Sequence, residues 1–384
     1  MFQKKIQLGE AYKLMKKVLF VATVVQKHIN VFHLPFLEQF QKDGYKTYVA
    51  ASNDTRDAEV KIQNCDEYIE IDFKRHPLHP GNIKAYRELK RVIKREQFDI
   101  INCHTPVGGL LGRLAARKLR RNGTKVLYTA HGFHFYKGAP LKNWLMYYPA
   151  ERFCSRFTDT LITINQEDYS LAKRKMKAKR IEYVPGVGIN LSRFDNVSID
   201  RGRKRRELGV PENAFLLVSV GEVNKNKNHQ VIVRAMAKLN NPNVHYAIAG
   251  IGDQEESLKR LAESFGIEKQ LHLLGYRKDI PEIDSVADAC CFPSLREGLG
   301  LGAIEGMACG LPIITSNVHG INDYSEDGVT GYKCSPFDVD GFAEAIKKLS
   351  EDTTTSKQIG SYNKELVKKY GVDKILVRMR EIYE

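Results

Sequence analysis

The feature that most constrains the fold of this chain is a repeated alternation of short apolar runs with helical stretches. Short apolar strands separated by helices are typical of βαβ units and parallel sheets. A first series predicts strands at 18–22, 48–51, 98–102, 126–129 and 160–164, with helices at 83–96, 109–119 and 145–157. A second series predicts strands at 215–220, 244–249, 271–274, 289–293 and 312–315, with helices at 230–239 and 255–265. The predicted fold is therefore α/β, with two Rossmann-like, doubly wound parallel-sheet domains facing each other across a cleft.

The alternation breaks between residues 188 and 212, where a charged stretch includes Asp200-Arg201-Gly202-Arg203-Lys204-Arg205-Arg206. We place the linker between the two domains there. The predicted domains are 15–195 and 205–369. A C-terminal helix at 370–384 is predicted to pack back on the first domain. Residues 1–14 fit neither series and are predicted to be an N-terminal extension.

The net charge of +14 is unevenly distributed. Residues 1–206 hold 40 Lys and Arg against 20 Asp and Glu, whereas residues 207–384 hold 20 against 26. A basic half favours an anionic partner, such as nucleic acid, anionic lipid or a phosphorylated substrate, although solubility alone explains some such asymmetries. The basic clusters at 113–121 and 173–180 have no interleaved aromatic residues, which favours a membrane surface over nucleic acid.

Other features of the composition point to the cytoplasm. No apolar run is long enough to span a membrane, and no signal peptide opens the sequence. The seven cysteines show no C-x-x-C spacing, so they are interpreted as reduced core residues. We therefore expect a cytoplasmic protein that associates peripherally with the inner face of the plasma membrane.

A glycine-rich turn between a strand and a helix is the strongest candidate for a binding site. It reads Arg296-Glu297-Gly298-Leu299-Gly300-Leu301-Gly302-Ala303-Ile304-Glu305. Glycines allow backbone amides to approach a ligand, and a helix N-terminus favours an anion. The carboxylates of Glu297 and Glu305 would accept hydrogen bonds from hydroxyl groups on either side of that anion. A phosphate between two polyols describes a nucleotide-sugar, although the same pattern also fits an ordinary helix start.

Two further segments follow predicted strands, and a third precedes a predicted helix. Gly221 precedes a loop with Lys225 and Lys227, which could neutralise a diphosphate or simply be solvated. His131 follows the strand at 126–129. Neither His131 nor His134 has the spacing or acidic neighbours of a zinc site, so no metal is predicted there. Asp338-Val339-Asp340 resembles a metal-binding D-x-D pattern, but it precedes a helix, which favours Asp338 as an N-cap.

Taken together, these motifs resemble the retaining GT-B glycosyltransferases of family 4. The resemblance covers the chain from about Val18 onward and is most specific at residues 294–301 and 308–314. The segments 103–106, 130–138 and 224–229 are similar to a narrower group, the capsule and exopolysaccharide glycosyltransferases. Members of that group extend saccharides that are linked to undecaprenyl diphosphate.

The resemblance implies roles for individual residues. Glu297 would contact the donor sugar, Glu305 the ribose, and His131 the transferred sugar, so His131 and Glu297 are the expected catalytic residues. The other implied donor-binding residues are Lys227, Arg277, Leu299, Gly300, Leu301, Gly221 and Lys225. The implied acceptor-binding residues are Lys27, His28, Phe32, His104 and Phe133. The resemblance thus implies that the domain 15–195 binds the acceptor and that the domain 205–369 binds the nucleotide-sugar donor. The sequence has Glu222 where the family commonly has arginine, and Lys225 is the expected replacement for that charge.

The implied reaction is metal-independent and needs no cofactor. A hexose or N-acetylhexosamine would pass from a UDP-sugar to a polyprenyl-diphosphate-linked saccharide with retention of configuration, in capsule, exopolysaccharide or related glycan biosynthesis. The alternatives are a family-4 transferase that acts on a small soluble acceptor and, from another class, a nucleic-acid-binding protein. A nucleic-acid-binding function would not explain the pattern of Glu297 and Glu305.

Overall fold

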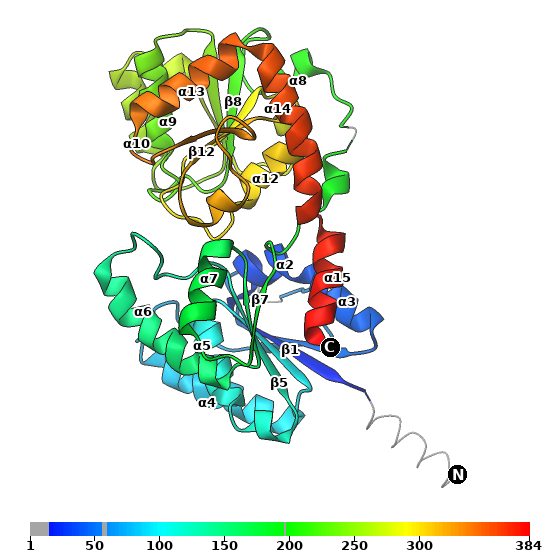
Figure 1. Cartoon of the computed structure of the whole chain (residues 1–384). Helices are drawn as coiled ribbons and strands as arrows, with labels where there is room; N and C mark the ends of the chain where they lie inside the picture. Colours follow the sequence, from blue (N-terminus) through cyan, green and yellow to red (C-terminus); the bar gives the residue numbers. More distant parts are fainter. Residues whose placement is uncertain (1–14, 56–59, 196) are drawn as a thin grey trace. The chain divides into compact units, whose positions relative to one another are not determined.

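A computed structural model describes residues 15–55, 60–195 and 197–384, so the predicted extension at 1–14 lies outside the described residues (Figure 1). The chain forms two compact units. The first comprises Met1–Val187 with Ile375–Glu384, and the second comprises Gly188–Lys374. Each unit has its own parallel sheet and its own core, and each is described by itself below.

The first unit has a seven-stranded parallel sheet in the order β3-β2-β1-β4-β5-β6-β7. Its strands are β1 Lys17–Val24, β2 Lys46–Ser52, β3 Glu67–Glu70, β4 Ile100–His104, β5 Lys125–Ala130, β6 Thr160–Thr163 and β7 Arg180–Tyr183. Its helices include η1 Val25–Ile29, α2 Asn30–Phe32, α3 Leu34–Lys42, α4 Gly81–Glu96, α5 Pro106–Ala116, α6 Leu141–Cys154, α7 Gln166–Lys175 and α15 Val372–Tyr383.

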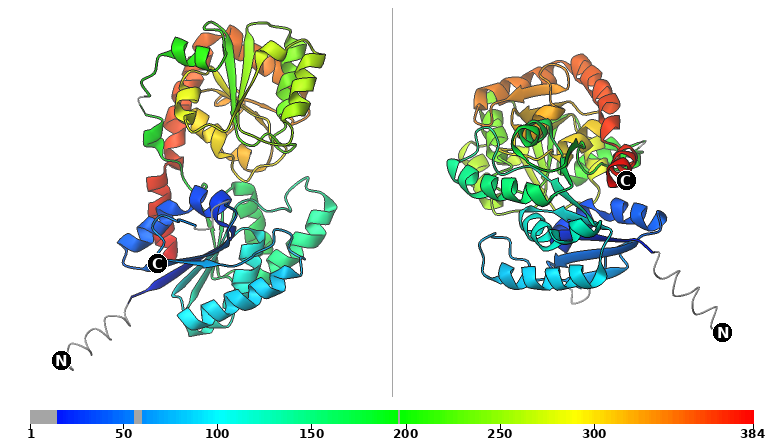
Figure 2. Two further views of the ribbon diagram at one scale, coloured as in Figure 1. Left: turned by 180° about the vertical axis from the view of Figure 1, so that it is seen from behind. Right: turned by 60° about the horizontal axis from the view of Figure 1, so that its bottom comes forward.

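Strand β1 lies in the middle of this sheet because its side chains are apolar on both faces. Leu19 and Val21 join a core cluster with α4 and α5 on one face. Val18 and Phe20 join a second cluster with α3 and α15 on the other face. Successive side chains of a strand point to opposite faces, so a continuous apolar run needs helices on both sides. Figure 2 shows helices on both faces of this sheet.

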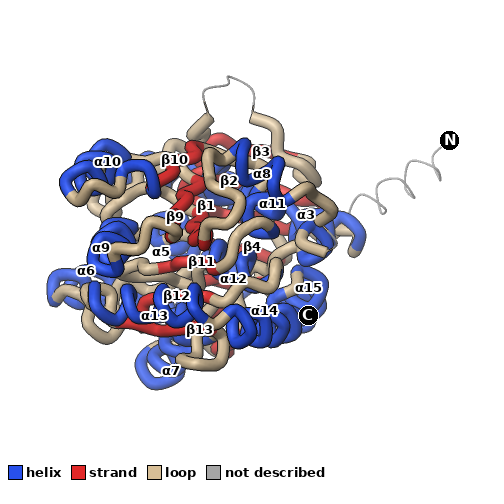
Figure 3. The backbone as a smooth tube through the Cα atoms, turned by 90° about the horizontal axis from the view of Figure 1, so that it is seen from above, coloured by secondary structure: helices blue, strands red, loops and turns tan. Residues whose placement is uncertain are grey.

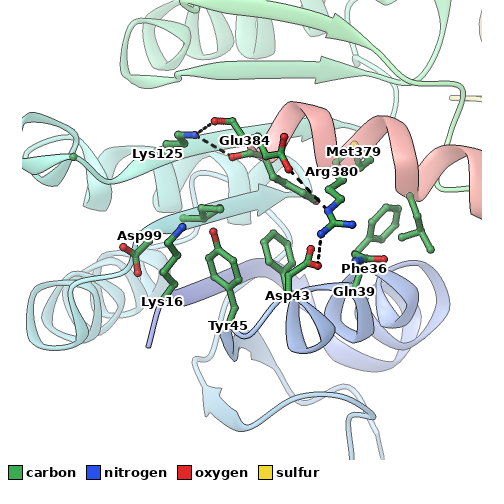
Figure 4. A pocket seen from close by; sticks show the side chains of 15 residues that line it. Lys16, Phe36, Gln39, Asp43, Tyr45, Asp99, Lys125, Met379, Arg380 and Glu384 are labelled. Atoms are coloured by element: carbon green, nitrogen blue, oxygen red, sulfur yellow. Dashed lines mark hydrogen bonds and ion pairs between the residues drawn. The ribbon is translucent and has the colours of Figure 1, made fainter. Parts of the chain in front are cut away.

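The C-terminal helix α15 belongs to the first unit from Ile375 onward, and a C-terminal helix at 370–384 was the prediction. The Tyr383 hydroxyl accepts a 2.9 Å hydrogen bond from Asn102 Nδ2 in β4. Arg380 lies 2.8 Å from Asp43, and the Lys125 ammonium donates to the carbonyl of Tyr383 at 3.1 Å (Figure 4). The helix therefore contributes both apolar surface and ion pairs to this unit.

The second unit has a six-stranded parallel sheet in the order β10-β9-β8-β11-β12-β13. Its strands are β8 Phe215–Val220, β9 Val244–Ala249, β10 Leu271–Gly275, β11 Ala289–Phe292, β12 Ile313–Ser316 and β13 Gly331–Cys334. Its helices include α8 Arg201–Glu207, α9 His229–Leu239, α10 Glu255–Ser264, α11 Ile280–Ser285, α12 Leu301–Ala308, α13 Val339–Glu351 and α14 Thr353–Leu366. Helices α9 and α13 lie side by side and share one core cluster (Figure 3).

The boundary between the units lies earlier than the predicted linker. Ile189 and residues 370–372 are joined by backbone hydrogen bonds of 2.9 Å, which hold the segment after Val187 in the second unit. The charged stretch near residue 200 is not a linker but helix α8, capped by the Asp200 carboxylate. Arg205 is 1% exposed and pairs with Asp288 at 2.6 Å, so part of the basic run is structural.

Two other expectations can be compared with the structure. Arg113 was placed on an anion-facing helix surface, but its side chain is buried, pairs with Glu151 at 2.8 Å and lies 3.8 Å from the Tyr128 ring centre. That expectation was wrong because the buried carboxylate could not be seen in the local sequence. Asp338 caps α13 by accepting a 2.8 Å hydrogen bond from the amide of Gly341, which confirms the predicted N-cap.

Each sheet has one point where the strand order changes direction. This point lies between β1 and β4 in the first unit and between β8 and β11 in the second. In open α/β sheets, ligands bind outside the carboxyl ends of the strands at such a point. The loops that follow these strands therefore hold the candidate sites.

Candidate active site

In the second unit, the loop after β11 runs into the N-terminus of α12. Gly300 precedes this helix with a φ of 90°, a conformation that side chains with a Cβ rarely adopt. A Cβ at Gly300 would also lie 2.5 Å from the Phe292 ring. The first amides of a helix have no intrahelical acceptor, so the α12 N-terminus offers donors to an anion. Leu299, Gly300 and Leu301, whose amides were predicted to bind phosphate, lie at this helix start.

Lys227 and Glu297 face each other across the point where the strand order changes. The Lys227 ammonium lies 2.7 Å from a Glu297 carboxylate oxygen and 4.3 Å from the Phe292 ring centre. The same carboxylate oxygen accepts a 3.0 Å hydrogen bond from the Ser294 hydroxyl, a contact that the sequence did not suggest. Both charged side chains are about one-sixth exposed, at 18% and 16%. The structure thus brings together two of the residues predicted to hold the donor.

Hydrogen bonds join the loop after β8 to the loop after β11. The Leu295 amide donates to the Asn226 carbonyl at 2.7 Å, and Asn228 Nδ2 donates to the Pro293 carbonyl at 3.1 Å. Gly221 and Gly250 end neighbouring strands in such close contact that a Cβ at Gly250 would lie 1.8 Å from the Gly221 carbonyl oxygen. Only glycine fits at position 250, so these contacts place the loop that carries Lys227.

Glu305 lies on α12, one turn beyond the helix start. Its burial raises the pKa of the carboxyl to about 7, an effect that Arg193 partly opposes. The neighbouring Asp284 is fully buried, and its pKa is also raised, first by burial and then by the charge of Glu305. A partly buried carboxyl with an elevated pKa is a group that gains from hydroxyl donors when it is ionised.

Two other predicted donor-binding residues lie in different surroundings. The Arg277 guanidinium is held by Asp279 at 2.5 Å and by Glu207 at 2.5 Å, in an ion-pair network that also contains Lys204. These pairs raise the pKa of Arg277. Lys225 is exposed in the same loop as Lys227. The structure therefore places Lys227 beside Glu297 and leaves the roles of Arg277 and Lys225 as predictions.

In the first unit, four histidines gather after β1, β4 and β5. They are His28, His33, His104 and His131, and their ring nitrogens include a set that lies within 4.8 Å of one another. His104 Nδ1 lies 3.3 Å from His131 Nε2, and His33 Nε2 lies 3.1 Å from His28 Nε2. The sequence predicted three of these residues as site residues but missed His33. His33 could have been identified from its position five residues after His28, on the segment that follows β1.

The remaining predicted acceptor residues divide into two groups. The Phe32 ring lies 6.2 Å from the His131 ring and 5.4 Å from the His28 ring, so it belongs to the cluster. Lys27 is exposed on η1 beside the cluster. Phe133 is 2% exposed and stacks on Phe135 in the core, a placement that gives its ring a structural role.

The histidine cluster is electrically neutral near pH 7. Burial lowers the pKa of His131 to about 4. Burial and then the neighbouring imidazoles lower the pKa values of His28, His33 and His104 well below the ordinary value. Neutral imidazoles can donate and accept hydrogen bonds or bind a metal ion. The sequence argument against a metal considered only His131 and His134 and did not foresee this grouping.

Comparisons with known proteins agree with this description. The family "Glycosyl transferase 4-like" matches residues 17–165, and "Glycosyl transferases group 1" matches residues 200–366. EpsD of Bacillus subtilis (strain 168), named as a glycosyltransferase, is 41% identical over 372 residues, which cover 96% of each chain. The UDP-Gal:alpha-D-GlcNAc-diphosphoundecaprenol alpha-1,3-galactosyltransferase of Escherichia coli is 28% identical over 309 residues, or 79% of each chain.

Solved structures of other glycosyltransferases have a similar fold. HepE of Anabaena, solved with UDP and glucose, has a TM-score of 0.79 at 19% identity, covering 96% of this chain and 99% of HepE. Two parallel-sheet α/β units of this kind define the GT-B class of glycosyltransferases. Within that class, the chain belongs to glycosyltransferase family 4, which confirms the resemblance predicted from the sequence.

Proposed function

We propose that this glycosyltransferase moves a hexose or N-acetylhexosamine from a UDP-sugar to a saccharide carried on polyprenyl diphosphate, with retention of configuration. The observation that carries the proposal is the Lys227–Glu297 pair beside the N-terminus of α12. It combines a cation, a carboxylate and free helix amides, which are the groups that a sugar diphosphate needs. The acceptor class is supported by the activity for which the Escherichia coli relative is named, and the setting in exopolysaccharide or related glycan synthesis by the likeness to EpsD.

Three groups of residues in the second unit would contact different parts of the donor. Lys227 and the amides of Leu299, Gly300 and Leu301 would hold the diphosphate, because a cation and a helix N-terminus both favour negative charge. Glu297 would accept hydrogen bonds from hydroxyl groups of the transferred sugar, and Glu305 would accept them from hydroxyl groups of the ribose. UDP as the carrier is supported by the UDP complexes of the structural relatives. Binding would release Lys227 from part of its contact with Glu297.

In the proposed reaction, the acceptor hydroxyl oxygen forms a bond to the anomeric carbon as the bond from that carbon to the diphosphate oxygen breaks. The hydroxyl proton passes to the departing diphosphate, so UDP leaves with the electron pair of the broken bond. Attack occurs on the face from which UDP departs, which retains the configuration. Lys227 and the helix amides stabilise the charge that develops on the diphosphate. His131 would position the sugar, and the proposal requires neither a metal ion nor a cofactor.

An enzyme with a lipid-linked acceptor must reach that acceptor at a membrane surface. None of the described helices is long and apolar enough to cross a membrane. Helix α6 instead exposes Leu141 at 73%, Leu145 at 71% and Met146 at 40%. Exposed apolar side chains on one helix, in a basic unit, support peripheral attachment to anionic lipid at the inner face of the plasma membrane. Arg113, which pairs with Glu151, does not belong to this surface.

The donor proposal can be tested by a thermal-shift screen of nucleotide-sugars. A ligand that binds only the folded form stabilises it by RT ln(1 + [L]/Kd), so at one concentration the donor that binds most tightly should raise the melting temperature most. UDP and one UDP-sugar should stabilise the wild type, and Glu297→Gln should reduce the effect of the sugar more than that of UDP. Stabilisation by GDP- or ADP-sugars alone would refute the choice of UDP.

The acceptor and the membrane surface need a separate experiment. Vesicles that contain anionic lipid should bind the wild type at low salt and release it at high salt. A Leu141→Ser and Leu145→Ser double variant should bind fewer vesicles at the same protein stability. Equal vesicle binding by wild type and variant would refute α6 as the attachment surface. Transfer to soluble saccharides but not to lipid-linked ones would favour the alternative acceptor class.

A further inference from the structure

A small cavity lies behind the histidine cluster in the first unit. Its volume is about 10 Å³, and its lining includes His33, His104 and Thr129 among apolar side chains such as Ile162 and Met379. The three polar residues are at most 5% exposed. Within the described residues, His33 Nδ1, His104 Nε2 and Thr129 Oγ1 have no hydrogen-bond partner. Three buried polar atoms without partners therefore belong to residues that line the same cavity.

The second ring nitrogen of each histidine is already engaged. His104 uses Nδ1 to reach His131 Nε2 at 3.3 Å, and His33 uses Nε2 to reach His28 Nε2 at 3.1 Å. The rings of His33 and His104 lie 3.9 Å apart between centroids, so the two hydrogen-bonded pairs are in contact. His33 and His104 thus each have one ring nitrogen left, and both residues line the cavity.

A cavity of this size and polarity fits one water molecule. One water needs a volume of about 10–15 Å³ and commonly makes about three hydrogen bonds to buried polar groups that lack other partners. The cavity is lined by residues with three such groups. Buried polar groups in folded proteins are nearly always hydrogen-bonded, so a dry cavity would leave three exceptions together.

We propose that one buried water links His33, His104 and Thr129, and that His104, anchored by this water, is the positioning residue that fixes the tautomer of His131. The inference rests on the proposed function for the role of His131 at the transferred sugar. His104 itself is 1% exposed, so it acts through His131 and not by contact with a substrate.

The tautomers of the pair are linked by elementary chemistry. A neutral imidazole has one N–H donor and one acceptor nitrogen. Across the contact between His104 Nδ1 and His131 Nε2, one nitrogen must therefore carry the hydrogen and the other must accept it. The hydrogen bond that His104 makes with the water decides which form His104 takes. This in turn decides whether Nδ1 of His131, the nitrogen that does not face His104, donates or accepts a hydrogen bond.

A metal ion shared by the four histidines would be a different arrangement, and the observations favour the water. A zinc–nitrogen distance is about 2.0–2.1 Å, and each ligating imidazole usually donates its other N–H to an oxygen acceptor. Here two nitrogen pairs lie at hydrogen-bond distance from each other. The nitrogens of His33 and His104 that lack partners would still lack them if a metal took the paired ones.

Two variants at one position separate the two bonds of His104. In His104→Asn, the amide lies near the place of Nδ1 and can keep the bond to His131. In His104→Gln, the amide lies near the place of Nε2 and can keep only the bond to the water. We expect kcat for His104→Gln to fall about 10- to 100-fold, by analogy with the loss of the partner that orients a metal-bound histidine. The KM for the donor should be unchanged, and His104→Asn, which keeps the bond to His131, should retain more of kcat than His104→Gln.

Nitrogen-15 NMR of the full chain without substrate gives a readout that does not depend on activity. His131 should show one tautomer in the wild type and a mixture in His104→Gln, which loses the contact with His131. A mixture in the wild type, or a single unchanged tautomer in His104→Gln, would overturn the positioning role even if the enzyme is a transferase. If the protein transfers no sugar but the tautomers behave as expected, only the proposed function fails.

The water itself can be observed in the wild-type protein, so the inference does not depend on the variants folding. A crystal structure that shows ordered solvent should place one water within hydrogen-bond distance of His33 Nδ1, His104 Nε2 and Thr129 Oγ1. An empty cavity would overturn the inference. One equivalent of zinc or another transition metal, retained through dialysis and bound by the histidines, would overturn it in favour of a metal site.

Discussion

The contact between Lys227 and Glu297 leads to a specific prediction for Lys227→Met, which removes the charge and keeps most of the apolar length. In the free protein, the Lys227 ammonium lies 2.7 Å from the Glu297 carboxylate, and both side chains are less than one-fifth exposed. In the proposed function, this ammonium contacts the diphosphate when the donor binds. The substitution should therefore affect both the stability of the free protein and its affinity for UDP.

The two effects have different sizes. A hydrogen bond to a charged group contributes about 1.5–3 kcal/mol, so loss of the phosphate contact should raise the Kd for UDP roughly 10- to 150-fold. In the free protein, Glu297 keeps its 3.0 Å hydrogen bond from Ser294. Loss of one partner of a partly buried carboxylate should lower the free energy of unfolding by about 1 kcal/mol, the low end of the range for an unsatisfied buried group.

Isothermal titration with UDP measures the first effect, and urea denaturation measures the second. Lys225→Met is the matched control, because Lys225 is an exposed lysine of the same loop. It should change the Kd for UDP less than Lys227→Met does and should leave stability unchanged. Equal affinities for UDP in the wild type and in Lys227→Met would refute the assignment of Lys227 to the diphosphate.

Other predictions concern a pKa, a buried arginine and a tight glycine contact. Burial raises the pKa of Glu305 to about 7 from an ordinary 4.5, so the folded form holds its proton to higher pH and its stability falls as pH rises through this range. Glu305→Gln should remove on the order of 1 kcal/mol of the fall between pH 6 and pH 8, measured by urea denaturation in both buffers. Arg205→Met should lower the free energy of unfolding by about 1–3 kcal/mol, because it removes the buried donor to the carbonyls of Ala214 and Val286, whereas the exposed Arg203→Met should not. Gly250→Ala should push the loop at Gly221 away and cost about 1–3 kcal/mol, with weaker UDP binding by titration.

The central strands of both sheets could be predicted from the sequence because their apolar runs are continuous. β8 and β9 lie at the predicted residues 215–220 and 244–249. The edge strands β3, β7 and β13 were missed, since an edge strand is only half covered and β3 and β7 carry charged residues in their four-residue spans. Local pattern identifies a strand best where helices bury both of its faces.

The candidate site was predictable where its residues follow a strand within one motif. Glu297 and Lys227 belong to two such motifs, and the structure places them in contact. His33 was missed because its place depends on the π-helical turn η1 and on the pairing of β1 with β4, which bring distant segments together. The structural role of Arg205 was missed for the same reason, since its partner Asp288 is distant in the sequence.

The most direct test of the central claim is UDP release by the purified protein in the presence of a UDP-sugar and a synthetic polyprenyl-diphosphate-linked saccharide. The account predicts that the wild type releases UDP at a rate that depends on the lipid-linked acceptor. Glu297→Ala should lose this release and still melt within a few degrees of the wild type. Acceptor-dependent release that is unchanged in Glu297→Ala would contradict the assigned site. No release with any UDP-sugar and lipid-linked acceptor would contradict the proposed reaction.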